Sequence, residues 1–250
     1  MRWIYISPHL DDAVLSCGGL IWEQARQGTP VEIWKFVCGF PQLQILSDFA
    51  NALHEEWGFS SAEQAVSFRR QEDQAAAKIV AAKTRYFDMP DCIYRLSPEG
   101  EPLYTDIFVP PHPAEAKLPA RIATDLSSGL KKDDVLVCPL TIGGHVDHVL
   151  VRQAVERFQR PLLYYADIPY LLNEPQALAP ATSKMEPRQF KVSPEGLRAW
   201  QDGIAAYGSQ IEILFEDEDR MRALIRDYWM ASKGVQLWQA RDGLDSTPDS

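Results

Sequence analysis

Two apolar runs separated by one helical segment restrict the fold of this chain most. Residues 3–6 (Trp-Ile-Tyr-Ile) and 31–37 (Val-Glu-Ile-Trp-Lys-Phe-Val) have the pattern of short buried strands, and 13–26 has helical apolar spacing. Such a strand–helix–strand order forms a βαβ unit with parallel strands and a right-handed crossover. The sequence therefore predicts an α/β fold, a Rossmann-like three-layer sandwich with a mostly parallel central sheet.

Polar side chains fill the expected turn between the first strand and the helix. His9, Asp11 and Asp12 stand there, at the strand end where open α/β sheets bind ligands. His9 and Asp12 are three residues apart, so a helical turn would point both at one place. A divalent metal with one free carboxylate beside it fits this cluster. Aspartates also cap helices, so this segment alone leaves a simple cap as an alternative.

A second segment repeats the arrangement far along the chain. The apolar run 134–139 is followed by His145, Asp147 and His148, and then by the amphipathic pattern of a helix at about 149–158. Two His/Asp clusters at the ends of two strands favour a metal site over two independent helix caps. Two histidines and one aspartate, with water in the fourth position, would form a catalytic zinc site at the C-terminal ends of the strands.

In order and spacing, these segments resemble the PIG-L/LmbE-like family of zinc-dependent N-deacetylases. That family carries His-Pro-Asp-Asp-Glu after its first strand and His-x-Asp-His after a later one. Here Leu10 stands in place of the proline and Ala13 in place of the glutamate, which leaves the metal-binding residue types present. Residues 69–72 (Arg-x-x-Glu), 164–170 and 207–210 also echo the family.

The resemblance implies one Zn²⁺ per chain, bound by His9, Asp12 and His148 with water completing the site. It also implies that Asp11, which is adjacent to a ligand but free, acts as general base. This division of roles between Asp11 and Asp12 comes from the family pattern, because spacing alone would allow the reverse.

Two further residues of the second segment are expected to serve the reaction. His145 would face the same pocket, stabilise the oxyanion and contribute to protonating the leaving amine. Asp147 is the expected partner of His145, fixing its tautomer and raising its basicity.

Residues at other expected strand ends indicate the substrate class. We expect Arg69, Asp91, Tyr165 and Asp167 to bind substrate, although a solvated ion pair for Arg69 and a turn-forming role for Asp91 are alternatives. The family resemblance implies removal of an N-acetyl or other small acyl group from an N-acetylglucosamine-type amino sugar or its conjugate. A zinc amidase for a non-sugar amide and a non-catalytic sugar- or nucleotide-binding protein are the alternative functions.

Charge and cysteine pattern narrow the classes of partner. The formal net charge of -10 argues against nucleic-acid or anionic-membrane surfaces, and no G-x-G-x-x-G or P-loop follows the first strand. The four cysteines lack C-x-x-C spacing, and no signal peptide or membrane-spanning run is evident. We therefore expect free thiols, a cytoplasmic location and a small-molecule partner. A homo-oligomer is compatible with the sequence.

Residues 1–241 are predicted to form a single α/β deacetylase domain, and 242–250 a disordered tail without apolar content. The region 38–61 is expected to form either a rim or lid of the site or a helical excursion with its own apolar cluster. The proline-rich loop 96–119 is expected to supply a second wall. Further strands are expected at 84–87, 161–165 and 190–192. Further helices are expected after a cap at Ser60 or Ser61 and at about 120–130, 194–207 and 217–231.

Overall fold

The computed structural model describes residues 1–42 and 46–241, so the expected tail at 242–250 lies outside the described residues. Its strands form one seven-stranded sheet in the order β3-β2-β1-β4-β5-β7-β6. The first five in that order pair in parallel, whereas β7 is antiparallel to both β5 and β6. The strands are β1 (Trp3–Ser7), β2 (Val31–Val37), β3 (Lys83–Met89), β4 (Val135–Pro139), β5 (Leu162–Tyr165), β6 (Met185–Lys191) and β7 (Gly234–Ala240).

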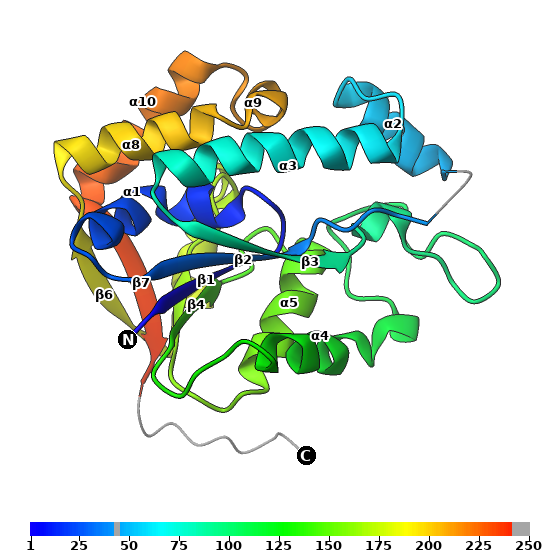
Figure 1. Ribbon diagram of the computed structural model, residues 1–250, viewed down its shortest axis with the longest axis horizontal. Coiled ribbons are helices and arrows are strands. Elements are labelled where there is room, and N and C mark those ends of the chain that lie inside the picture. The colour runs from blue at the N-terminus through cyan, green and yellow to red at the C-terminus, as the bar shows by residue number, and fades with distance from the viewer. Residues whose placement is uncertain (43–45, 242–250) are drawn as a thin grey trace.

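Helices cover both faces of this sheet, which confirms the predicted three-layer α/β class. Helices α1, α3 and α8 lie over one face, and α4 and α5 lie under the other (Figure 1). The helices are α1 (Asp12–Arg26), α2 (Asp48–Glu56), α3 (Ala62–Ile79), α4 (Leu118–Ser127), α5 (Val146–Glu156), α6 (Tyr170–Asn173), α7 (Leu178–Ala181), α8 (Pro194–Ala205), α9 (Gly208–Phe215) and α10 (Glu218–Ser232). Among the described residues, no helix has both the length and the apolar content needed to cross a bilayer.

The sheet changes winding direction between β1 and β4. Strand β1 pairs with β2 on one side and with β4 on the other, and the helices that follow β1 and β4 lie on opposite faces. Residues 3–5 of β1 align with 135–137 of β4. A switch point of this kind opens a crevice at the carboxyl ends of the strands. The two polar segments of the sequence therefore emerge side by side.

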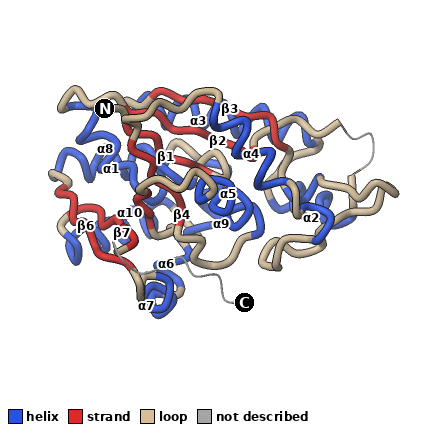
Figure 2. Tube along the Cα trace, turned by 90° about the horizontal axis from the view of Figure 1, so that it is seen from below, coloured by secondary structure: helices blue, strands red, loops and turns tan. Residues whose placement is uncertain are grey.

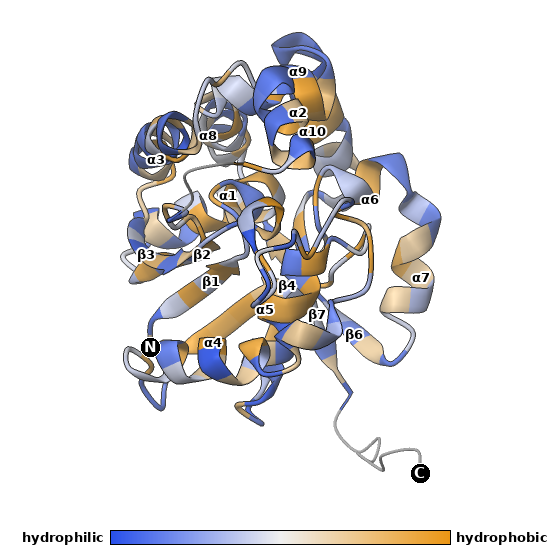
Figure 3. Ribbon diagram, turned by 90° about the vertical axis from the view of Figure 1, so that its right-hand side faces the viewer, coloured by the Kyte–Doolittle hydropathy of each residue, from blue (hydrophilic) through white to orange (hydrophobic). Residues whose placement is uncertain are grey.

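Side chains of β1 alternate between the two faces of the sheet, so this short apolar run contributes to the core on each face. Ile4 and Ile6 are buried on one face with Trp34, whereas Tyr5 is buried on the other face with Val137. Successive strand side chains point to opposite faces, so a fully buried strand is apolar at every position. The strands in the middle of the sheet are accordingly coloured hydrophobic in Figure 3.

Helices α1 and α8 approach closely because two glycines of α1 lie against one tryptophan. A Cβ atom at Gly18 would lie 2.7 Å from Cδ1 of Trp200, and one at Gly19 would lie 3.0 Å from its Cε3. The indole Nε1 of Trp200 donates hydrogen bonds to the Val14 and Leu15 carbonyls at 2.9 and 3.0 Å. This contact fixes α1, the helix that carries Asp12, against α8.

The structure also contains elements that the sequence did not reveal. Strand β7 and helix α9 were not predicted, and β6 is longer than expected. Helix α2 lies within the region 38–61, and Figure 2 shows it at the opposite end of the molecule from β6. Strand β7 lies between β5 and β6 in the sheet, so backbone hydrogen bonds to both neighbours stabilise it. That residues 1–241 fold as one domain stays a prediction.

Candidate metal centre and active site

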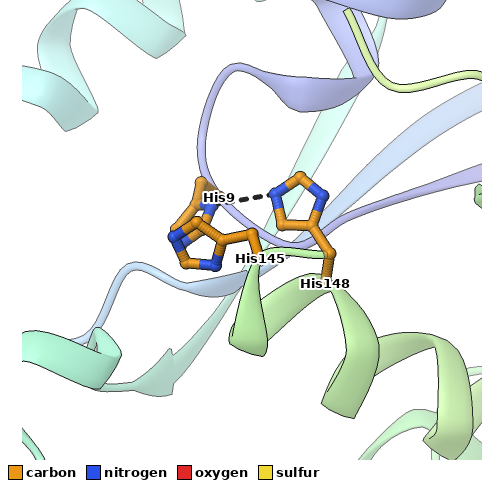
Figure 4. Close-up of side chains that lie close together, drawn as sticks. All are labelled: His9, His145 and His148. Carbon is orange, nitrogen blue, oxygen red and sulfur yellow. Dashed lines mark hydrogen bonds between the residues drawn. The ribbon is translucent and has the colours of Figure 1, made fainter. Parts of the chain in front are cut away.

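The donor groups of three side chains, His9, Asp12 and His148, form a compact triangle at the switch point, in which Asp12 turns a different carboxylate oxygen to each histidine. His148 Nε2 lies 3.3 Å from His9 Nδ1 and 3.3 Å from Asp12 Oδ1, and His9 Nδ1 lies 3.5 Å from Asp12 Oδ2. In Figure 4 a dashed line joins the His9 and His148 rings, which are tilted by 47° to each other, and the His145 ring lies next to His9. Ligand atoms around a tetrahedral zinc ion would be about 3.3–3.5 Å apart. The donor types and their spacing therefore fit one divalent metal.

The charges of this cluster favour a cation. Burial opposes ionisation of Asp12, but the neighbouring His148 and His9 hold its pKa well below the usual range. Burial opposes protonation of His148, yet Asp12 and Asp167 raise its pKa to about 9. Carboxylates that stabilise positive charge on an imidazole would equally stabilise a metal ion in its place.

The turn before α1 separates the roles of its two aspartates. The Asp12 carboxylate accepts a 2.6 Å hydrogen bond from the His9 backbone N–H, which folds the turn over the cluster. Asp11 is the N-cap residue of α1, but its side chain makes no capping hydrogen bond. Its Oδ2 instead accepts a hydrogen bond from Arg69 Nη2 at 3.2 Å. The Asp11 carboxylate is therefore available to the cavity, and the simple-cap alternative does not describe it.

Asp167 and Tyr165 do not lie where we expected substrate contacts. Asp167 is buried behind His148: its Oδ1 is 2.8 Å from His148 Nδ1, and its Oδ2 accepts a hydrogen bond from the Ile142 N–H at 3.0 Å. Tyr165 is fully buried, and its hydroxyl donates to the Ile6 carbonyl at 2.9 Å. The prediction that they contact substrate is corrected, because the end of β5 turns these side chains into the protein.

The Asp147 side chain supports His9 rather than His145, which corrects a second expectation. Its Oδ2 lies 3.3 Å from His9 Nε2 and accepts a 3.1 Å hydrogen bond from the Cys92 N–H, while its Oδ1 accepts one from Arg95 Nη1 at 2.6 Å. Only the backbone N–H of Asp147 reaches His145, donating to Nδ1 at 3.1 Å. The first turn of α5 directs the carboxylate away from the His145 ring.

This backbone contact assigns the tautomer of His145. Because Nδ1 accepts a hydrogen bond, the proton of the neutral ring sits on Nε2. Burial, together with the neighbouring His9 and His148, holds the pKa of His145 well below its usual value. The ring is therefore a neutral hydrogen-bond donor at the cavity.

A cavity of about 340 Å³ opens above the cluster. Arg69 and Asp91 line it, as expected, and the Arg69 guanidinium lies 5.6 Å from the ring centroid of Trp57. The region 38–61, for which a border of the site and a helical excursion were the two expectations, fits both: it contains helix α2 with an apolar cluster of its own, and α2 supplies Leu53 and Glu56 to the cavity. The loop 96–119, expected as a second wall, supplies Ile107 and Phe108. Helix α9 also forms part of the wall, and no local pattern had indicated this. The apolar lining residues are Leu15, Leu53, Trp57, Ile93, Ile107, Phe108, Pro169, Tyr170, Ile213 and Leu214.

The fold and the donor set are those of a metal-dependent hydrolase. Residues 4–158, more than half of the chain, match the family model described as PIG-L: GlcNAc-PI de-N-acetylase. The chain belongs to the PIG-L family. The protein is accordingly an N-deacetylase, a hydrolase of an amide C–N bond.

Relatives of known activity extend over the whole chain. A 2'-N-acetylparomamine deacetylase from Niallia circulans is 26% identical over 271 residues, which cover 98% of this chain and 96% of that protein. The teicoplanin deacetylase Orf2, in a zinc-inhibited form, is 26% identical with a TM-score of 0.80 and coverage of 98% and 100%. The A40926 pseudoaglycone deacetylase Dbv21 is 26% identical, with a TM-score of 0.76 and coverage of 96% of each chain.

Proposed function

We propose that this protein is a zinc-dependent hydrolase that removes an N-acetyl or other small acyl group from an N-acetylglucosamine-type amino sugar or its conjugate. The observation that carries the proposal is the triangle of His9, Asp12 and His148 donor groups, with Asp11 and His145 beside it in one cavity. The relatives described as deacetylases of 2'-N-acetylparomamine and of the A40926 pseudoaglycone support an acylated amino sugar as substrate.

His9, Asp12 and His148 would hold one Zn²⁺ per chain. When bound, the ion supplies Lewis-acid polarisation of the amide carbonyl and activates water. Support comes from the match between the donor spacing and tetrahedral zinc, and from a relative solved with zinc.

Asp11 would act as the general base. Its carboxylate takes one proton from the attacking water, whose oxygen bonds to the carbonyl carbon. The protonated Asp11 then passes that proton to the amine nitrogen as the C–N bond breaks, which gives the free amine and acetic acid. The acid loses its remaining proton to the amine or to water, so acetate is released. Arg69, 3.2 Å away, fixes the orientation of one carboxylate oxygen and leaves the other for this transfer.

His145 would stabilise the developing oxyanion. Its neutral ring directs Nε2–H to the cavity, where a preorganised donor stabilises the transition state more than the ground state. Asp147 would keep His9 in the orientation that presents Nδ1 to the metal, since it engages the opposite ring nitrogen.

Arg69 and Asp91 would bind hydroxyl groups of the sugar. Both line the cavity near the metal cluster, with Asp91 Oδ2 3.6 Å from His9 Nε2. Trp57 and Tyr170 offer aromatic faces for the sugar ring. The four cysteines are all free and buried, which supports a cytoplasmic location, where thiols stay reduced. The partner would be a small molecule, the acylated sugar itself. A homo-oligomer remains compatible with this proposal.

The test is acetate release by the purified enzyme from N-acetylglucosamine, an N-acetylated aminoglycoside and an N-acetylglucosaminyl conjugate with an aromatic aglycone. We expect release from at least one of them, and its loss in Asp11→Asn. Hydrolysis of only a peptide or aliphatic amide would reject the amino-sugar assignment and favour the alternative zinc amidase.

A further inference from the structure

A buried chain of charged groups runs outward from His9. Asp147, fully buried, lies between His9 Nε2 on one side and Arg95 Nη1 on the other, at 3.3 and 2.6 Å. Arg95 is itself 8% exposed, and its Nη1 also donates to the Pro90 carbonyl at 3.2 Å. One guanidinium therefore fixes both the Asp147 carboxylate and the segment that leads to Asp91.

The far side of Arg95 is held by the loop 96–119. Glu115, 7% exposed, places Oε1 2.7 Å from Arg95 Nε and Oε2 3.1 Å from Nη2. The buried Tyr104 hydroxyl donates to the same Glu115 oxygen at 2.5 Å and accepts a hydrogen bond from the His112 N–H at 2.8 Å. The N–H of Arg95 Nε makes no hydrogen bond of good geometry, so its short distance to Glu115 is an ion-pair contact. A buried ionic cluster of this kind still resists rearrangement, since separating any partner would leave a buried charge uncompensated.

The same loop forms part of the cavity wall. Ile107 and Phe108 line the cavity, and the Ile107 carbonyl accepts a 2.9 Å hydrogen bond from the N–H of Val146, next to His145. Phe108 packs edge-on against His145, with ring centroids 6.0 Å apart. The wall that meets the substrate and the support of His9 thus share one anchor, Arg95.

We propose that Arg95 is a positioning residue that couples His9 to the substrate wall: through Asp147 it orients His9, and through Glu115 it fixes the loop that carries Ile107 and Phe108. The coupling rests on the proposed function, in which His9 is a metal ligand. The inner half of the guanidinium, Nη1, faces Asp147 and so supports His9. The outer half, Nε and Nη2, faces Glu115 and so holds the loop.

The two halves can be separated by substitution. Arg95→Met removes both, and loss of such a support raises the zinc dissociation constant by about 10–100-fold. Glu115→Gln loosens only the outer half, so we expect zinc affinity near that of the wild type but a several-fold rise in KM with little change in kcat. Arg95→Lys keeps a positive charge beside Asp147 but has no second nitrogen to reach Glu115. We therefore expect the same pattern as in Glu115→Gln: zinc affinity near that of the wild type and a raised KM.

The matched controls are Arg2→Met and Glu32→Gln. Arg2 also bridges two carboxylates, Glu32 at 2.9 Å and Asp134, but at the start of β1, the end of the sheet away from the site. These variants should change only the unfolding midpoint.

Zinc affinity is measured by competition with a chromophoric chelator without substrate, and KM and kcat by acetate release. Equal zinc affinity in wild type and Arg95→Met would overturn the inner half of the coupling. An unchanged KM in both Glu115→Gln and Arg95→Lys would overturn the outer half. If the wild type binds zinc but releases no acetate, the proposed function fails while the zinc series still tests the link to His9.

Discussion

Asp147 Oδ2 lies 3.3 Å from His9 Nε2, although 138 positions separate the two residues along the chain. The second polar segment thus supplies the carboxylate that orients the histidine of the first. Asp167 stands in the same relation to His148, at 2.8 Å from Nδ1. Each proposed ligand histidine is therefore held from its far ring nitrogen by a buried carboxylate.

Asp11→Asn and Asp12→Asn should separate catalysis from metal binding. In Asp11→Asn the side-chain amide cannot accept a proton, so we expect turnover to fall by about 10²–10⁴-fold with zinc content unchanged. Asp12→Asn removes an anionic donor of the triangle and should lose zinc as well. Elemental analysis and acetate release check both variants. An empty site in Asp11→Asn with a filled one in Asp12→Asn would exchange their roles.

Removing metal should abolish activity reversibly. We expect inactivation by a chelator, recovery with added Zn²⁺, and no bound zinc in the His9→Ala, His148→Ala double variant. Asp167→Asn should weaken zinc binding by about 10–100-fold, because His148 loses its anionic partner. The control Asp134→Asn alters a buried carboxylate paired with Arg2 at the other end of the sheet and should keep zinc affinity. Full zinc content in the double variant would contradict the assignment of the ligands.

Arg69→Ala should lower kcat/KM without loss of zinc. The variant loses a charge-assisted hydrogen bond to Asp11 and a proposed sugar contact, worth about 10–100-fold in rate. Arg70→Ala is the matched control, since the neighbouring guanidinium binds the Cys38 carbonyl and Asp88 instead. Equal kinetics in the two variants would remove Arg69 from the site.

Gly18→Ala should destabilise the fold. The added Cβ would lie 2.7 Å from the Trp200 ring, so α1 and α8 must separate at a cost of about 1–3 kcal/mol in free energy of unfolding. Gly208→Ala places its Cβ 3.6 Å from Glu72 Oε1, an ordinary contact, and should be nearly neutral. Urea unfolding followed by circular dichroism measures the difference. Equal midpoints would show that the helix contact is not tightly packed.

The Asp134 carboxylate should contribute acid-sensitive stability. Burial opposes its ionisation, but hydrogen bonds from Arg2 and from the Lys131 N–H lower its pKa below the usual value. Because the pKa is lower in the folded state, the contribution is present above about pH 4 and is lost as the pH falls further. Asp134→Asn should therefore be less stable than the wild type by about 1–3 kcal/mol at pH 7, with a smaller gap at pH 3. A gap independent of pH would exclude this pair as its origin.

Local pattern was sufficient to predict the strands and polar turns that frame the site. The apolar runs of β1, β2 and β4 are buried on both faces, so their composition alone marks them, and each polar turn follows directly in the sequence. The spacing of His9 and Asp12 also placed both side chains in one cluster, as the structure has them.

Partners set by tertiary packing could not be predicted in this way. Which histidine the Asp147 carboxylate meets depends on the position of β1 beside β4, which no local spacing encodes. Asp167 looked like a substrate contact because it follows a strand, and only the packing of α5 places His148 in front of it. Strand β7 adds to the sheet through β5 and β6, and its own sequence has little period-two alternation.

Pairing of β1 with β4 also determines when the site can form during synthesis of the chain. His148 follows His9 by 139 positions, so a nascent chain that ends before α5 carries only part of the donor triangle. Contacts so distant in sequence close late and slowly, after the local βαβ unit. Zinc would then bind only the completed pairing and stabilise it by mass action. Metal release would thus report separation of β1 from β4, and not fraying of the outer strands.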